Sequence, residues 1–379
     1  MRPIIFNGKF YSGALNGVHR VADRLIREAD RLLDAMPPGS APEARLLVPR
    51  RRDWTPALSR IRLEEQALGH CQIWEQLALP WKARGAVLVN LCNLAPLLAR
   101  RRILLLHDAQ FMFSDSSYPP RQRWGHRLLA PAMMRGSAVP LTVSQYSREV
   151  IDLTGVCPRE RVGVVHNGVD HMLDLAAAPD ALAKWGLVPR GYVLMFGSAK
   201  RYKNTEIVFR AFAGAGLRGL KLAIVGEDGR AGTAATPNAV CVGKVSDSVL
   251  RTLYEHAICL ATPSRTEGFG LPPLEAMQLG CPSVVAPAGA MPEMCRDAVC
   301  YADPDDPAEW VAAIRALQGD ERLRAAKVAA GLSRAQTLTW ARAGAQLLNH
   351  ALALAGAAAV AHEPIAKPAL PASRRPVPA

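Results

Sequence analysis

The chain has 379 residues, of which 50% are hydrophobic and 6% aromatic, and its formal net charge is +13. This length is enough for two domains that each bury a core, and the few aromatic residues are typical of α/β layers. No apolar run has the length of a convincing membrane span, and we expect no signal peptide. The eight cysteines form no Cys-x-x-Cys pair and no cluster with histidines, so we expect reduced thiols, no metal site and a cytoplasmic protein.

The positive charge lies mostly in the first 172 residues, in three arginine clusters at Arg50–Arg52, Arg100–Arg102 and Arg121–Arg135. A nucleic-acid-binding protein should combine such clusters with a recognised module, and the sequence contains none, so we expect no nucleic-acid partner. Two interpretations stay open, namely ordinary solvated surface and contact with an anionic membrane.

The first half begins with an apolar strand, which is followed by a helix over Val18–Leu33 whose apolar residues recur at helical spacing. The strands of this half are expected at Pro3–Phe6, Ala44–Val48, Ala86–Asn90, Ile103–His107 and Ala138–Val143. The second half repeats the plan, with helices at Thr205–Ala213 and Asp247–His256 and strands at Tyr192–Gly197, Lys221–Val225, Ala239–Val242, Ala257–Thr262 and Ser283–Ala286.

Strands and helices that alternate at these lengths predict parallel sheets with right-handed crossovers. We therefore expect an α/β protein with an amino-terminal domain over residues 1–172 and a carboxyl-terminal domain over residues 173–335. The linker is expected within His171–Pro189, a final helix over residues 336–358, and a disordered Pro- and Ala-rich tail over residues 362–379.

The most informative segment is Glu267-Gly-Phe-Gly-Leu-Pro-Pro-Leu-Glu275, which follows a predicted buried strand. Pro272 and Pro273 suit the first turn of a helix, where a missing N–H costs nothing. Glu267 is therefore expected on the loop that leaves a strand, and Glu275 one turn into the next helix. Ligands of open α/β sheets bind at this place, and a helix amino terminus there attracts phosphate.

This segment resembles the signature of the retaining glycosyltransferases of family four, which have the GT-B fold of two Rossmann-like domains facing across a cleft. The resemblance implies that Glu267 holds hydroxyls of the donor sugar and that Glu275 holds the ribose of the nucleotide. It also implies that the backbone of Gly268, Phe269, Gly270 and Leu271 lies against the sugar and diphosphate, where glycine permits close approach.

A second match is Phe196-Gly-Ser-Ala-Lys-Arg-Tyr-Lys-Asn204, which resembles the diphosphate-binding loop of that family. Lys203 and Asn204 match its pattern, whereas Ser198 and Tyr202 stand where arginine is common, so Arg201 or Lys200 is expected to supply the missing cation. Positive charge is needed there because the leaving diphosphate gains negative charge as the glycosidic bond breaks. The resemblance also places the turns Gly226-Glu227 and Gly243-Lys244-Val245-Ser246 beside the base and ribose.

Two features of the first half match the same family. Gly17, in Asn16-Gly-Val-His-Arg20, corresponds to a glycine loop that faces the donor diphosphate and the acceptor. His107 ends an apolar strand, and the resemblance implies a place near the anomeric carbon. Asp108 is expected either to fix the tautomer of His107 or to cap a turn.

The chain is thus expected to be a retaining, metal-independent hexosyltransferase that needs no cofactor besides its nucleotide-sugar donor. The resemblance implies that residues 1–172 bind the acceptor and that residues 173–335 bind the nucleotide sugar. Analogy favours GDP-mannose, a lipid-linked oligosaccharide or glycan acceptor, a role in bacterial surface-polysaccharide biosynthesis, and a peripheral place at the inner membrane. A sugar-nucleotide epimerase of the same fold and a non-catalytic scaffold are the alternatives. A glycoside hydrolase is disfavoured by the spacing of the two glutamates, and a nicotinamide enzyme by the missing Gly-x-Gly-x-x-Gly.

Overall fold

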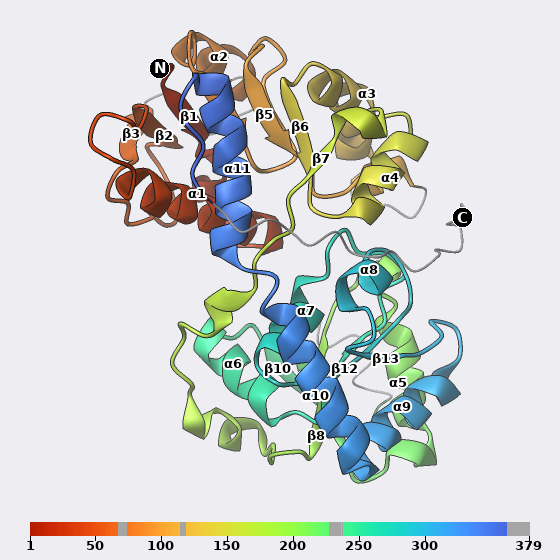
Figure 1. Ribbon diagram of the computed structural model, residues 1–379. Helices are drawn as coiled ribbons and strands as arrows, with labels where there is room; N and C mark the ends of the chain where they lie inside the picture. Colours follow the sequence, from red (N-terminus) through yellow and green to blue (C-terminus); the bar gives the residue numbers. More distant parts are fainter. Residues whose placement is uncertain (67–73, 114–118, 227–235, 237, 362–379) are drawn as a thin grey trace. The chain divides into compact units, whose positions relative to one another are not determined.

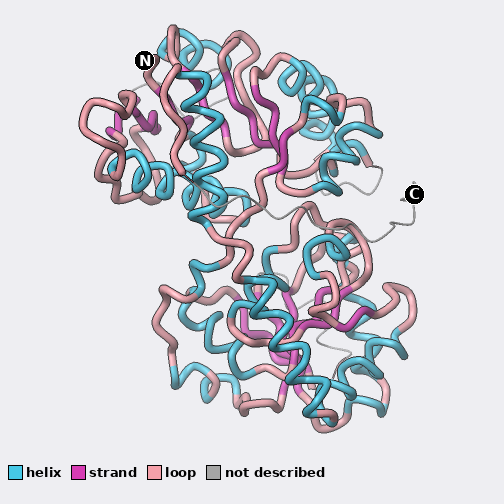
Figure 2. The backbone as a smooth tube through the Cα atoms, viewed as in Figure 1, coloured by secondary structure: helices cyan, strands magenta, loops and turns pink. Residues whose placement is uncertain are grey.

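A computed structural model describes residues 1–66, 74–113, 119–226, 236 and 238–361, which form two compact units. The first unit contains Met1–Gly168 and the segment that begins at Trp340, and the second contains Val169–Thr339. Figure 2 shows that strands occupy the centre of each unit and that helices surround them. Glu227 and the predicted tail 362–379 lie outside the described residues.

The first unit is built on a parallel sheet with the strand order β3-β2-β1-β4-β5-β6-β7 (Figure 1). Its strands are β1 (Ile4–Asn7), β2 (Ala44–Pro49), β3 (Arg62–Gln66), β4 (Val87–Asn90), β5 (Arg102–Leu105), β6 (Val139–Thr142) and β7 (Gly163–Val164). Its helices are α1 (Gly17–Asp34), α2 (Leu79–Lys82), α3 (Pro120–Arg135), α4 (Gln145–Leu153) and α11 (Trp340–Ala355). Short helical turns η1 (Lys9–Ser12), η2 (Trp74–Ala78), η3 (Gln110–Met112) and η4 (Arg159–Arg161) connect these elements.

Helix α1 begins where the Asn16 side chain accepts a hydrogen bond from the backbone N–H of His19 at 3.0 Å. Its apolar residues, among them Val21, Leu25 and Leu33, are buried. The last helix of the chain, α11, packs against α1, where Gly344 leaves room for the Glu28 side chain. The carboxyl-terminal segment is therefore part of the first unit.

The second unit has a parallel sheet with the order β10-β9-β8-β11-β12-β13. Its strands are β8 (Tyr192–Phe196), β9 (Lys221–Val225), β10 (Ala239–Gly243), β11 (Cys259–Thr262), β12 (Ser283–Val285) and β13 (Cys300–Tyr301). Its helices are α5 (Thr205–Ala213), α6 (Asp247–His256), α7 (Leu271–Gln278), α8 (Met291–Cys295), α9 (Pro307–Gly319) and α10 (Glu321–Ala335). It also contains the short turns η5 (Asp170–Met172), η6 (Pro179–Ala181), η7 (Ala183–Trp185), η8 (Arg201–Lys203) and η9 (Ala215–Leu217).

The core of the second unit has one layer on each face of its sheet. Along β8, Val193 and Met195 pack in one cluster with Trp310, whereas Tyr192 and Leu194 pack in the other. This alternation follows from the period of two along a strand. Both faces are covered by helices, which explains why the strand sequences are almost continuously apolar.

Two expectations from the sequence need correction. The predicted linker within His171–Pro189 belongs to the second unit, because Met172, Leu182 and Leu187 are buried in its core and the division falls after Gly168. Arg102 is not part of a basic surface, since only 1% of it is exposed. Its guanidinium donates hydrogen bonds to the carbonyl oxygens of loop Leu97–Ala99 and of Met133, and thereby ties this loop to α3.

Candidate active site

The strand order of each sheet reverses once, and ligands of open α/β sheets bind at the carboxyl ends of the two strands that flank such a reversal. In the second unit the reversal lies between β8 and β11, which are neighbours. The loop after β8 carries Lys203, and the loop after β11 carries Glu267. The Lys203 ammonium lies 2.5 Å from Oε1 of Glu267. The fold thus joins two predicted site residues that are 64 positions apart in the chain.

Backbone contacts hold these two loops in place. The N–H of Arg265 donates to the carbonyl oxygen of Tyr202 at 2.7 Å, and the Arg265 side chain forms an ion pair with Asp305. Asn204 has a positive φ of 50°, and its side chain donates to the carbonyl oxygen of Pro304 at 2.8 Å. Asn204 therefore shapes the turn after Lys203, and Arg201 lies exposed on the same turn.

Gly289 supports the loop of Glu267, and sequence reasoning missed it. A Cβ at Gly289 would lie 2.5 Å from the backbone nitrogen of Glu267, and φ of Gly289 is +61°. The next residue, Ala290, donates its N–H to the carbonyl oxygen of Glu267 at 3.0 Å. In the sequence, Gly289 is distinguished only by its position soon after strand β12. A glycine at such a position is common in α/β proteins, so it did not indicate this role.

The Gly268–Leu271 segment forms a tight entry into α7. Gly270 has a φ of 82°, and Met291 fills the space where its side chain would lie. Phe269 is buried, with 5% of it exposed. Because Pro272 and Pro273 have no N–H, the first turn of α7 offers fewer hydrogen-bond donors than an ordinary helix, and Leu271 supplies the first of them.

Glu275 lies inside the second unit, with 6% of it exposed. Its Oε1 is 3.3 Å from Nε2 of His171, and its Oε2 accepts a hydrogen bond from the Tyr254 hydroxyl at 3.4 Å. These contacts fix the carboxylate on α7. Val245, in the loop after β10, packs against the same apolar cluster as Tyr254.

His107 lies in the first unit at the carboxyl end of β5, and 7% of it is exposed. Its Nε2 is 2.8 Å from the carbonyl oxygen of Leu91, and its backbone N–H donates to Asn93 Oδ1 at 2.8 Å. Burial lowers the pKa of His107 to about 4. A carbonyl oxygen can only accept, so Nε2 carries the proton and Nδ1 of the neutral ring keeps its lone pair.

Of the two roles expected for Asp108, the structure supports the cap, because its carboxylate accepts from the N–H of Gln110 at 3.1 Å. The tautomer of His107 is set by Leu91 instead. Gly17 is the first residue of α1 and is exposed.

Within the described residues, no group of three or more His, Cys, Asp or Glu side chains is placed to hold a metal ion. No helix in that same part of the chain is long and apolar enough to cross a bilayer.

Comparison with known proteins agrees with the sequence resemblance. Residues 190–320 match the protein family described as "Glycosyl transferases group 1". The D-inositol 3-phosphate glycosyltransferase of Mycobacterium sp. (strain KMS) is 30% identical over 280 residues, which cover 68% of this chain and 61% of that protein. The chain thus spans about three fifths of the length of this curated relative.

Solved structures share the fold over nearly the whole chain. Sucrose-phosphate synthase from Thermosynechococcus elongatus superposes with a TM-score of 0.70 at 16% identity, covering 91% of this chain and 97% of that one. Anabaena Alr3699/HepE, solved in complex with UDP-glucose, superposes with a TM-score of 0.69 at 17% identity, covering 92% and 98%.

The fold and the two strand-order reversals define a protein of the GT-B class. The matched family and the curated relative support a GT-B glycosyltransferase of the family-four type, with the match to the group 1 family lying in residues 190–320.

Proposed function

We propose that the protein transfers a hexose from a nucleoside-diphosphate sugar to an acceptor hydroxyl. The observation that carries this proposal is the pairing of Lys203 with Glu267 at the β8–β11 reversal, inside the group 1 domain. A carboxylate and an ammonium at such a place suit the two ends of a donor, which are the sugar hydroxyls and the diphosphate.

Lys203 has three N–H donors, so its ammonium can bind a phosphate oxygen while one hydrogen bond to Glu267 persists. This contact strengthens as the bond between the anomeric carbon and the phosphate oxygen breaks, because the leaving diphosphate gains negative charge. The Glu267 backbone is held by the hydrogen bond from Ala290 and packs closely against Gly289, which has no side chain. The Glu267 carboxylate accepts hydrogen bonds from sugar hydroxyls.

We propose retention by front-face attack. The acceptor oxygen forms a bond to the anomeric carbon on the side that the diphosphate leaves, and the acceptor proton passes to the departing phosphate oxygen. This step needs neither a carboxylate nucleophile nor a metal. Neutral His107, with an unprotonated Nδ1, accepts a hydrogen bond from a sugar hydroxyl and does not act as a cation.

Two donors are proposed for testing. GDP-mannose follows from the resemblance of the sequence motifs, and UDP-glucose follows from the solved complex of the HepE protein.

We propose a lipid-linked oligosaccharide or glycan as acceptor, with peripheral contact to an anionic membrane through α3. This helix exposes Trp124 and Leu128, by 69% and 61%, together with Arg121. Tryptophan, leucine and arginine exposed on one helix favour the interface of an anionic bilayer.

The experiment is a thermal-shift screen of the full chain against GDP, UDP, ADP and their sugar conjugates with EDTA present, followed by a hydrolysis and transfer assay with the donor that binds. We expect a shift for one base and its sugar conjugate. Lys203→Ala should remove the shift, and Lys184→Ala, an exposed lysine of the same unit, should retain it. Donor binding with interconversion of the sugar would indicate an epimerase, and absence of binding by any nucleotide would contradict the proposal.

A further inference from the structure

The first unit has a pocket at its own strand-order reversal, between β1 and β4. Its volume is about 250 Å³. The pocket is lined by the last residue of β1 and the segment that follows it into α1, by residues that follow β4, and by the π-helical turn η2. These residues are Asn7, Lys9, Phe10, Ser12, Gly13, His19, Glu75, Leu91, Cys92 and Leu94. Pockets for drug-sized ligands measure roughly 300–1,000 Å³, so this one suits a single ring-sized group.

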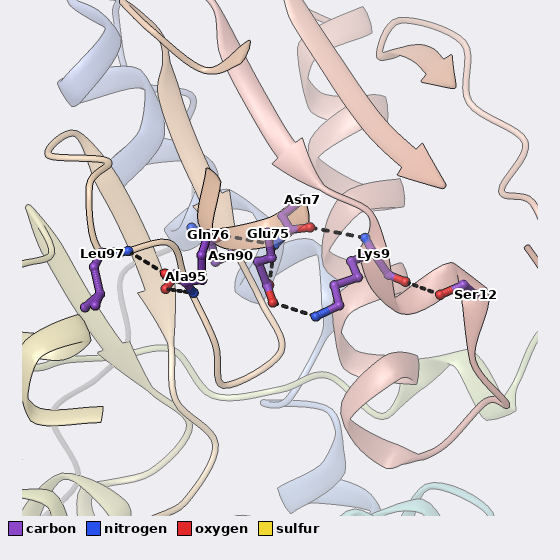
Figure 3. A network of polar contacts seen from close by, with 8 residues as sticks. All are labelled: Asn7, Lys9, Ser12, Glu75, Gln76, Asn90, Ala95 and Leu97. Carbon is purple, nitrogen blue, oxygen red and sulfur yellow. Dashed lines mark hydrogen bonds and ion pairs between the residues drawn. The ribbon is translucent and has the colours of Figure 1, made fainter. Parts of the chain in front are cut away.

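A buried polar network forms one wall of the pocket (Figure 3). The Glu75 carboxylate, of which 4% is exposed, accepts from the Lys9 ammonium at 2.7 Å and from the Asn7 amide at 2.9 Å. The Asn7 amide also donates to Asn90 Oδ1 at 3.1 Å. The next residue, Gln76, bonds to the backbone of Ala95 and Leu97 and so fixes the π-helical turn that presents Glu75.

The stability of the fold does not by itself explain why this buried network is present. A buried ion pair stabilises a fold weakly, because removing two charges from water offsets most of their attraction. π-Helical turns are rare and occur frequently at functional sites. The network also borders a strand-order reversal, which is the preferred place for a ligand. Recognition of a ligand therefore explains this wall better than stability does.

The lining offers hydrogen bonds without a surplus of positive charge. Lys9 is the only lysine or arginine among the described residues that line the pocket, and Glu75 neutralises it. Burial lowers the pKa of His19, so this ring is mostly neutral at pH 7. Burial and the neighbouring Glu75 raise the pKa of Cys92, which therefore stays a thiol. A phosphate placed here would face a buried carboxylate and no surplus positive charge.

We propose that this pocket is the subsite for an uncharged, polyhydroxylated ring of the acceptor, and that Glu75 determines its specificity by excluding phosphorylated rings. This inference rests on the proposed transferase function. Paired hydroxyls of such a ring can donate to the Glu75 carboxylate and accept from the Lys9 ammonium, which has three N–H donors. Leu91, which lines the pocket, also holds His107 through its carbonyl oxygen, so the subsite adjoins the predicted catalytic histidine.

The test uses saturation-transfer NMR with the full chain and two probes, methyl α-mannoside and mannose 6-phosphate, with the donor nucleotide from the screen at saturation. We expect the wild type to bind the neutral probe and to bind the phosphorylated probe at least about tenfold more weakly. Glu75→Gln leaves Lys9 without its carboxylate and should raise affinity for mannose 6-phosphate about tenfold, since hydrogen bonds to charged groups are the stronger ones. The double variant Lys9→Met with Glu75→Gln should not show this rise in affinity for mannose 6-phosphate, because it also lacks the Lys9 ammonium.

Glu64→Gln, which removes a partly exposed carboxylate paired with Arg45 in the same unit, is the matched control and should leave both affinities unchanged. Equal or preferred binding of mannose 6-phosphate by the wild type would overturn the inference, and this comparison needs no variant to fold. Unchanged preference in folded Glu75→Gln would overturn it as well. Nucleotide binding is measured in the same samples, so failure of the proposed function is recognised separately from failure of this subsite.

Discussion

Lys203 and Glu267 form an ion pair across the strand-order reversal of the second unit, with 2.5 Å between Nζ and Oε1. Their side chains are 29% and 14% exposed, so each keeps some access to solvent and to a ligand. Under the proposed function, the pair sets the positive charge for a diphosphate directly beside the carboxylate for a sugar.

Replacement of Lys203 by alanine should weaken binding of the nucleoside diphosphate by roughly 10- to 100-fold, because hydrogen bonds to charged groups contribute about 1.5–3 kcal/mol. Titration calorimetry with the nucleotide found in the screen measures this effect. Lys203→Arg should restore part of the affinity, since the charge returns with different geometry. Equal affinity in Lys203→Ala and wild type would remove Lys203 from the donor site.

Replacement of Gly289 by alanine should displace the Glu267 loop. The new Cβ would meet the Glu267 backbone nitrogen at 2.5 Å in addition to the strain of φ at +61°, which costs on the order of 1–3 kcal/mol. We expect a lower midpoint of urea unfolding and a larger loss of donor affinity. Gly219→Ala is the control, because φ there is +87° but no atom lies within 4 Å of the added Cβ. Similar donor affinity in the two variants would show that the contact with Glu267 is unimportant.

Glu275→Gln should reduce nucleotide affinity about tenfold if the carboxylate also holds the ribose, because a charged acceptor becomes a neutral one. Tyr254→Phe provides the comparison, since it removes the 3.4 Å hydrogen bond to Glu275 and leaves the carboxylate in place. Calorimetry should rank Glu275→Gln as the weaker binder. The reverse order would assign Glu275 a structural role on α7.

The neutral state of His107 predicts a dependence of stability on pH. The pKa of His107 is about 4 in the folded protein and 6.5 for an ordinary solvated histidine, so the unfolded chain binds the proton more readily. This difference in pKa contributes up to about 3 kcal/mol to the free energy of unfolding. The contribution is fully present above pH 6.5 and is lost as the pH falls toward 4. Urea titrations at about pH 7 and about pH 4.5 measure the free energy of unfolding at each pH. Its decrease between the two pH values should be smaller for His107→Gln than for wild type. His256→Gln, in the second unit, should behave like wild type.

The exposed side chains of α3 predict binding to anionic vesicles. Sedimentation with phosphatidylglycerol vesicles should retain the wild type and should release it at high salt, because the arginine contribution is screened. Trp124→Ser with Leu128→Ser should reduce binding several-fold, whereas Leu173→Ser, an exposed leucine of the second unit, should not. Binding to neutral vesicles at equal strength would contradict the role of charge.

The sequence by itself determined the α/β class, most strands and the helix α7. Those elements depend on neighbours in the chain: the apolar run of β11, the turn at Gly270, and the prolines that begin α7. The edge strand β3, Arg62–Gln66, was missed because its sequence RLEEQ lacks an apolar alternation. Its strand conformation is stabilised by pairing with β2.

Only the tertiary structure decided which residues meet. Glu75 lies 68 positions from Asn7, and Gly289 contacts Glu267 through the ends of adjacent loops. Neither contact leaves a periodic signal, because the strand order brings distant loop ends to the same edge of a sheet. The burial of Arg102 and of His107, and with it the lowered pKa of His107, likewise depend on the elements packed around these side chains, which a linear pattern does not record.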